Sequence, residues 1–305
     1  IQWAEGSLPA GTISPTLVAE APFLIFAPAA QQYLNETARQ ALREFRPALQ
    51  IDDIQYATLE YELTIVPARA GFLAGLLGLA LAILSLVSTP AAFGLSPTTS
   101  TATSIVIILY LMIQAPFYVV LVYHTLRQLR LVASIHAMVK EINLFQLFPV
   151  YAFSSLTART GLVIVLLIYY TYFFFYFLNI RGSTPGLLGT ISSVILLLVA
   201  SVCFVLPLLG MHRRLAHEKS RLLGESSRRL ESTLAALHER VDHGEYEKVD
   251  GMQKAVAALQ AEYQIIDKIS TWPWRTETLR TFLTTITLPI IMYLISRFIG
   301  RLVGL

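Results

Sequence analysis

The sequence predicts an all-α integral membrane protein with two transmembrane helical hairpins, a polar helical hairpin, and a C-terminal helix that spans the membrane or lies in its interface. Three observations predict this fold class. Residues 161–178 form an uncharged run that covers about 27 Å as a helix, close to the roughly 30 Å hydrocarbon core of a bilayer. Three further runs of similar length lie at 70–87, 104–123 and 187–210. Charged residues make up only 14% of the chain, compared with about 25% in an average soluble domain.

Residues 1–69 are expected to form a small N-terminal extramembrane segment. Residues 22–27 are apolar but too short to span, so we interpret them as a strand or a membrane-surface contact. The run 29–49 has the apolar spacing of an amphipathic helix, which Pro47 ends. Residues 56–65 alternate apolar and polar side chains. This alternation indicates a half-buried strand, although a helix leading into the membrane fits nearly as well.

Residues 70–123 form the first predicted transmembrane hairpin. Its first span carries Gly71, Gly75 and Gly78 at steps of three and four residues. Small residues at this spacing let a second helix approach closely, which is how helices associate where lipid supplies no hydrophobic drive. We therefore interpret these glycines as a helix-packing face.

The second span of this hairpin carries Gln114 and Pro116 near its middle. The proline should bend the helix and free a backbone carbonyl. The Gln114 amide is a candidate to bond that carbonyl or a neighbouring helix. The alternative is that Gln114 lines a pore or a ligand site.

Residues 124–160 are predicted to form a cytoplasmic amphipathic helix, followed by an aromatic interfacial loop that Pro149 interrupts. The helix carries His124 and His136. Neither histidine has a second metal-type residue at a useful spacing, so no metal site is expected.

Residues 161–210 form the second predicted hairpin, and the aromatic run at 169–177 is typical of a belt at one membrane interface. Aromatic side chains would also suit a quinone, haem or chlorophyll pocket. However, the four spans contain no histidine that could serve as an axial ligand. The single Cys203 lies inside an apolar run, so neither a disulfide nor a thiolate metal site is expected. We expect no cofactor.

The Lys and Arg residues predict the orientation of the chain. Four precede the first span, four lie between the hairpins and twelve lie from Arg213 to Arg280. The link 89–103 has none, and the link 179–186 has only Arg181. By the positive-inside rule both hairpins point outward. This predicts a multi-pass protein of the cell membrane with its N-terminal and central polar parts in the cytoplasm.

Residues 211–270 are predicted to form a cytoplasmic antiparallel helical hairpin. Between 249 and 266, apolar residues recur at alternating three- and four-residue steps, which indicates a coiled-coil seam. A seam between subunits is the alternative to a seam within one chain. Acids interleave the basic residues, so no nucleic-acid partner is expected. Arg213, Arg214 and Arg275 are candidate contacts for lipid phosphates.

Residues 271–305 return to the membrane, because Trp272 and Trp274 are typical of the interface. The apolar stretch that follows, at 281–296, is slightly short for a span, so a fifth span and an interfacial helix both remain open. Its polar residues include four threonines that are candidates for pore lining or helix packing: Thr281, Thr284, Thr285 and Thr287.

The sequence argues against two classes of function, enzymes and ion- or proton-coupled transporters. The sequence has no nucleophile–base pair, phosphate loop, clustered carboxylates or metal-ligand spacing, so we do not expect an enzyme. The four spans contain no Asp, Glu, Lys or Arg, which disfavours an ion- or proton-coupled transporter.

Two functions remain. The first is a homo-oligomeric channel or pore with a cytoplasmic helical collar, packed through the glycine face and lined by the Gln114 helix or the threonine-bearing helix. The second is an accessory, scaffold or sensor subunit of a larger membrane complex, whose cytoplasmic helices bind a partner. Membrane lipid surrounds the spans in both.

Overall fold

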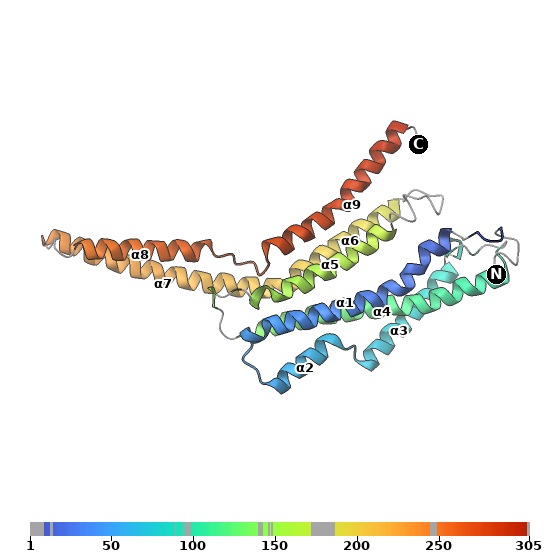
Figure 1. The fold of residues 1–305 in the computed structure, drawn as a ribbon, viewed down its shortest axis with the longest axis horizontal. Coiled ribbons are helices and arrows are strands. Elements are labelled where there is room, and N and C mark those ends of the chain that lie inside the picture. The colour runs from blue at the N-terminus through green and yellow to red at the C-terminus, as the bar shows by residue number, and fades with distance from the viewer. Residues whose placement is uncertain are drawn as a thin grey trace.

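The computed structural model describes residues 9–12, 15–88, 90–93, 95, 99–139, 143–145, 147, 149–171, 187–244 and 249–303. Every regular element within these ranges is a helix (Figure 1). The all-helical fold predicted from the sequence is therefore confirmed for the described part of the chain.

The N-terminal part is helical throughout, so both strand interpretations are wrong. Residues 22–27 belong to α1 (Pro15–Phe45), and most of 56–65 belongs to α2 (Asp53–Thr64). A one-turn 3₁₀ helix (Arg46–Ala48) ends the first of these near the predicted position. The alternating pattern at 56–65 failed because local capping favours a helix: the Asp52 carboxylate accepts a hydrogen bond from the Gln55 backbone N–H at 2.7 Å.

Four segments are long and apolar enough to cross a membrane, as expected of a multi-pass membrane protein: Asp53–Ser88, Thr101–Met138, Pro149–Tyr170 and Leu197–Asp242. The first three include α3 (Ala68–Ser88), α4 (Thr101–Met138) and all but the last residue of α5 (Ala152–Thr171), and the fourth begins within α6 (Leu187–Val205) and continues into the next helix. Short 3₁₀ turns at Pro90–Phe93 and Pro149–Tyr151 precede α4 and α5.

Two helices continue well beyond their apolar runs. The predicted second span and the amphipathic helix after it are one unbroken element, α4. The fourth span passes through a 3₁₀ turn at Leu206–Leu208, which contains Pro207, into α7 (Leu209–Asp242). α7 packs side by side with α8 (Val249–Lys268), and this pair, which we call the arm, projects away from the other helices (Figure 1).

The remaining helices form a bundle around α5. α3 packs on α4, α5 packs on α6, and α1 lies against both α4 and α5. α9 (Thr276–Val303) contacts α5 and then diverges from α5 and α6 toward its C-terminal end (Figure 1). The arm and α2 lie at one end of the bundle, whereas the N-terminal ends of α1 and α4 and the C-terminal end of α9 lie at the other.

The main hydrophobic core lies where α1, α4, α5 and α7 meet. We call this region the junction. Phe45, Ile135, Phe153 and Met211 are fully buried there, one from each helix. The face of α1 predicted from the apolar spacing of 29–49 supplies its centre, because Leu34, Ala38 and Leu42 are also buried. These residues join the arm to the bundle.

Candidate functional site: the buried junction and the neighbouring pockets

A buried polar cluster lies at the outer edge of the junction, between α1, α2 and α4. The His124 Nε2 donates to the Asn35 Oδ1 at 2.6 Å. The Gln128 Nε2 donates to the same oxygen at 2.8 Å and to the Leu63 carbonyl at 2.9 Å. His124 and Gln128 are each 1% exposed. The cluster thus fixes the depth and rotation of α4 against α1, because a slip of either helix would leave these groups buried and unbonded.

His124 is held neutral. Its Nδ1 has no hydrogen-bond partner in the protein. Burial lowers the pKa of His124 to about 4, and the positive charge of Arg127 acts in the same direction. Arg127 is itself bound to the end of α2, since it donates to the carbonyls of Glu62 and Ile65.

His136 lies about three helical turns beyond His124 on α4, in the centre of the junction. Its ring makes edge contacts with Phe45 at 5.5 Å and with Phe153 at 5.4 Å between ring centroids. Burial lowers the pKa of His136 to about 4; the Pro207 carbonyl opposes this shift and the Arg214 charge adds to it. Both histidines lie outside the apolar run 104–123 of α4. Both are buried side chains whose pKa is lowered by burial.

The structure brings two of the predicted packing features into contact. A Cβ placed on Gly78 would lie 2.7 Å from the Pro116 Cα and 2.8 Å from the Ala115 carbonyl oxygen. A Cβ on Gly75 would reach only the Pro116 Cβ, at 4.0 Å, and one on Gly71 would meet the neighbouring Val66 side chain. Gly78 is therefore the point of closest approach between α3 and α4, and it lies against the proline.

Gln114 is linked to α1 indirectly, because it bonds Tyr118 and Tyr118 bonds α1. Its side chain forms a hydrogen bond with the Tyr118 hydroxyl. That hydroxyl donates to the Phe23 carbonyl at 3.1 Å, and the Tyr118 ring stacks on Phe26. The N-terminal half of α1 thus lies beside an apolar run predicted to span the membrane. Gln114 takes part in helix packing here; a pore-lining role for it stays a prediction.

The threonines of α9 bond to their own helix. Thr284, Thr285 and Thr287 each donate to the carbonyl four residues earlier, at 2.6–2.9 Å. Thr281 instead lines a pocket of about 250 Å³ between α5 and α9, together with Ser155, Arg159, Glu277, Thr278 and Phe282.

The three arginines proposed for lipid contact differ in their surroundings. Arg214 donates to the carbonyls of His136 at 3.0 Å and Val139 at 2.5 Å, so it caps the C-terminal end of α4. Arg275 lies 3.8 Å from the Glu44 carboxylate. Arg213 is exposed. Contact with lipid phosphates stays a prediction for all three.

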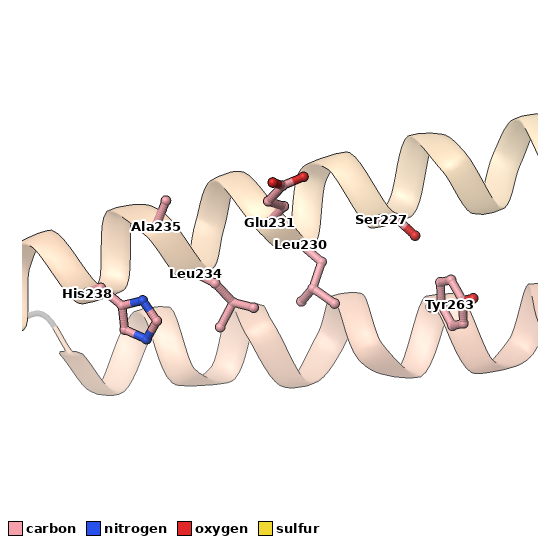
Figure 2. A pocket seen from close by; sticks show the side chains of 7 residues that line it. All are labelled: Ser227, Leu230, Glu231, Leu234, Ala235, His238 and Tyr263. Atoms are coloured by element: carbon pink, nitrogen blue, oxygen red, sulfur yellow. The ribbon is translucent and has the colours of Figure 1, made fainter.

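A second, open hollow of about 510 Å³ lies along the arm. Its lining includes Ser227, Leu230, Glu231, Leu234 and His238 of α7 and Tyr263 of α8 (Figure 2). Leu230 and Leu234 point toward α8, and Tyr263 lies across from Ser227 (Figure 2). We call this surface the arm groove.

Sequence reasoning found part of this arrangement. It named both histidines, but it did not name Asn35 and Gln128 as members of the His124 cluster, and it did not single out Arg159. The spacing of His124 and Gln128, one turn apart on the apolar side of an amphipathic helix, was an available signal. Asn35, their common partner on α1, carried no such sequence signal. Among the described residues, no group of three or more His, Cys, Asp or Glu side chains is placed to hold a metal ion.

Comparison of the chain with protein-family models, with curated proteins and with solved structures finds no match.

Proposed function

We propose that this protein is a non-enzymatic membrane scaffold in which two helical hairpins, α3–α4 and α5–α6, cross the membrane and hold the arm in the cytoplasm. The arm associates with the arm of a second copy. The abundance of Lys and Arg from Arg213 to Arg280, twelve in all, supports the cytoplasmic placement.

One observation carries the proposal: the apolar seam of the arm remains partly exposed along its length. Ile266 is buried at the bundle end, but Tyr263 is 36% exposed and Val241 is 38% exposed. Beside this seam lies the arm groove, whose floor is formed by Leu230 and Leu234 (Figure 2). Helices of this kind owe most of their stability to packing of an amphipathic face, and a two-helix unit covers only one side of its seam.

A second copy is the occupant that fits best. The seam extends over both helices, so two arms can combine into a four-helix bundle with a common apolar interior. The arm surface carries both signs of charge, as in the Arg229–Glu225 ion pair at 2.5 Å and the Lys219–Asp267 pair at 3.7 Å. Like surfaces therefore approach one another without strong repulsion.

Disulfide cross-linking tests the association. Ser227→Cys places a thiol in the arm groove, whereas Ala261→Cys places one at an exposed position away from the seam. The native Cys203 is buried and serves as the common background. We expect mild oxidation in native membranes to yield a dimer with Ser227→Cys and much less with Ala261→Cys. A monomeric mass in mild detergent together with no cross-link from Ser227→Cys would overturn the proposal.

The homo-oligomeric channel is the second candidate, and one observation favours it. Thr281, Thr284 and Thr287 form an exposed hydroxyl-bearing strip on the first half of α9. In an oligomer such strips could line a path, with α9 as the pore helix. The engagement of Gln114 with Tyr118 makes the α4 alternative weaker. Purified protein in liposomes should pass ions under this reading, and the flux should change with Thr284→Val. Liposomes that stay tight would favour the scaffold.

A further inference from the structure

The pocket between α5 and α9 contains an arginine, Arg159, that forms no ion pair with any carboxylate of the described residues. Arg159 donates from Nη1 to the Thr37 hydroxyl at 2.9 Å, and its guanidinium lies 5.5 Å from the centre of the Tyr33 ring. Because a guanidinium offers five N–H donors in a planar fork, these contacts leave most of its capacity for an anion.

The sequence predicts that the pocket lies near the level of the lipid headgroups. Arg159 precedes by two residues Gly161, where the apolar run of α5 begins. At Gly161 the two helices touch: an added Cβ would lie 2.5 Å from the Phe282 ring. On the α9 side, the stacked indoles of Trp272 and Trp274, with ring centroids 4.4 Å apart, precede the helix and are typical of the membrane interface.

The rest of the lining completes a site for a phosphate ester. Thr278 and Thr281 line the pocket with Arg159, and hydroxyls and guanidinium together are common donors to phosphate oxygens. Ser155 also lines it, but its hydroxyl donates to the Ala152 carbonyl at 2.8 Å. Phe282, which is 4% exposed, forms an apolar wall. A volume of about 250 Å³ is below the roughly 300–1,000 Å³ of sites that enclose a drug-sized ligand, so it suits a headgroup rather than a whole lipid.

Glu277 decides the kind of headgroup. Its carboxylate lies in the same pocket as Arg159, yet the two form no ion pair in the described structure. A purely anionic headgroup would meet repulsion from Glu277, whereas a headgroup with both a phosphate and an ammonium group would satisfy both charges. Farther along α9, the exposed Leu283, Leu288 and Ile291 offer apolar contacts for acyl chains.

We infer that this pocket binds the headgroup of a zwitterionic phospholipid, with the phosphate at Arg159 and the primary ammonium at Glu277. The site is independent of arm association, because it lies on the opposite side of the junction and shares no residue with the arm groove. Bound lipid would bridge α5 and α9 at the point from which α9 diverges (Figure 1).

Native mass spectrometry of delipidated protein tests the site with three probes: phosphatidylethanolamine, phosphatidylglycerol and the soluble headgroup glycerophosphoethanolamine. We expect phosphatidylethanolamine to bind at least tenfold more tightly than phosphatidylglycerol. Arg159→Gln should weaken phosphatidylethanolamine binding about tenfold or more. Glu277→Gln should remove the preference between the two lipids, because it should weaken the binding of phosphatidylethanolamine and strengthen that of phosphatidylglycerol. Arg228→Gln, at an exposed arginine of the arm that lines neither pocket and is not a candidate lipid contact, is the matched control and should change neither.

Thr37→Val separates binding from structure. It removes the intramolecular partner of Arg159 without touching the pocket lining, so lipid binding should persist even if the protein becomes less stable. Unchanged binding in Arg159→Gln, or the same lipid preference in Glu277→Gln as in the natural chain, would overturn the site. Equal affinity for glycerophosphoethanolamine and the intact lipid would overturn the membrane lipid as its ligand.

Discussion

The helices α4 and α5 are both apolar enough to cross a membrane, but they occupy opposite positions in the fold. Only 6% of the membrane-capable stretch of α4 is buried inside the protein, whereas 56% of that of α5 is buried. α4 carries exposed Ile105, Leu109 and Ile113, while α5 buries Phe153, Leu156 and Val165. In lipid an exposed apolar side chain costs nothing, so apolarity alone does not tell an outer helix from a central one.

The polar residues account for the difference. α5 buries Ser154, Thr157 and Thr160 at its start, and Arg159 reaches Thr37 on α1. Ser154 and Thr157 donate to the carbonyls three residues earlier, whereas the Arg159 guanidinium needs a partner that lipid cannot provide and finds it on α1. This contact ties the start of α5 to the centre of the bundle. α4 bonds α1 from Tyr118 onward, beyond its exposed apolar stretch: Tyr118 donates to the Phe23 carbonyl, and His124 and Gln128 bond Asn35. The comparison teaches that internal polar groups, more than the length of an apolar run, decide which helices are central.

The largest expected effect comes from opening the junction. Phe45 is fully buried and its ring lies 5.1 Å from that of Phe153, so Phe45→Ala should lower the free energy of unfolding by about 3–5 kcal/mol. Phe72→Ala, at a site on α3 that is 67% exposed, should stay within about 0.5 kcal/mol. Thermal unfolding in one detergent compares them. Equal losses would show that the outer helices depend on packing as much as the junction does.

The next effect concerns the close contact of Gly78 on α3 with Pro116 on α4. Gly78→Val would force a side chain into the backbone at Pro116, and we expect a loss of about 3 kcal/mol, the upper end of the usual cost of overpacking. Gly75→Val adds the same side chain where the nearest atom is 4.0 Å from the new Cβ, so it should be nearly neutral. Thermal unfolding of both variants provides the measurement. Similar behaviour of the two would contradict the assigned point of closest approach.

Acid should weaken the junction through His136. Burial lowers the pKa of this histidine from 6.5 to about 4, so the unfolded chain binds its proton first as the pH falls. The contribution of neutral His136 to the free energy of unfolding is complete above pH 6.5 and is lost progressively as the pH falls toward 4. Since one pKa unit corresponds to about 1.4 kcal/mol, we expect a loss of about 2 kcal/mol between pH 7 and pH 4.5.

A His136→Leu variant isolates this effect from that of the carboxylates. Its melting temperature should fall less than that of the natural chain over the same pH range, whatever its stability at pH 7. Parallel pH profiles for the two proteins would exclude His136 as a source of acid sensitivity.

The smallest effect distinguishes two neighbouring arginines. Arg214→Gln removes two charge-assisted hydrogen bonds to the end of α4 and should cost about 1 kcal/mol, because the group is partly exposed to solvent. Arg213→Gln, at the exposed neighbour, should cost less than about 0.5 kcal/mol. The two variants carry the same change in net charge, so thermal unfolding compares position alone. A greater loss from Arg213→Gln would contradict the capping role of Arg214.

Sequence reasoning succeeded where the signal is local or depends on length. The apolar runs predicted helices long enough to cross a membrane, and the spacing at 29–49 predicted the buried face of α1. It failed at 22–27 and 56–65, where short segments are ambiguous between a strand and a helix. For the candidate sites, sequence reasoning named Gly78 and Pro116 separately, but no feature of either residue predicted that they lie in contact.

What the sequence determined by itself is the class of environment: the transfer free energy of long uncharged segments is a sum over residues, so composition and length suffice to assign them to lipid. What only the tertiary structure decided is which residues of different helices contact each other. The Asn35–His124–Gln128 cluster, the pairing of Arg159 with Thr37 and the pocket it shares with Glu277 join residues up to 122 positions apart. Such contacts depend on how the helices turn their faces to one another, and every internal polar group that finds its partner contributes to that choice.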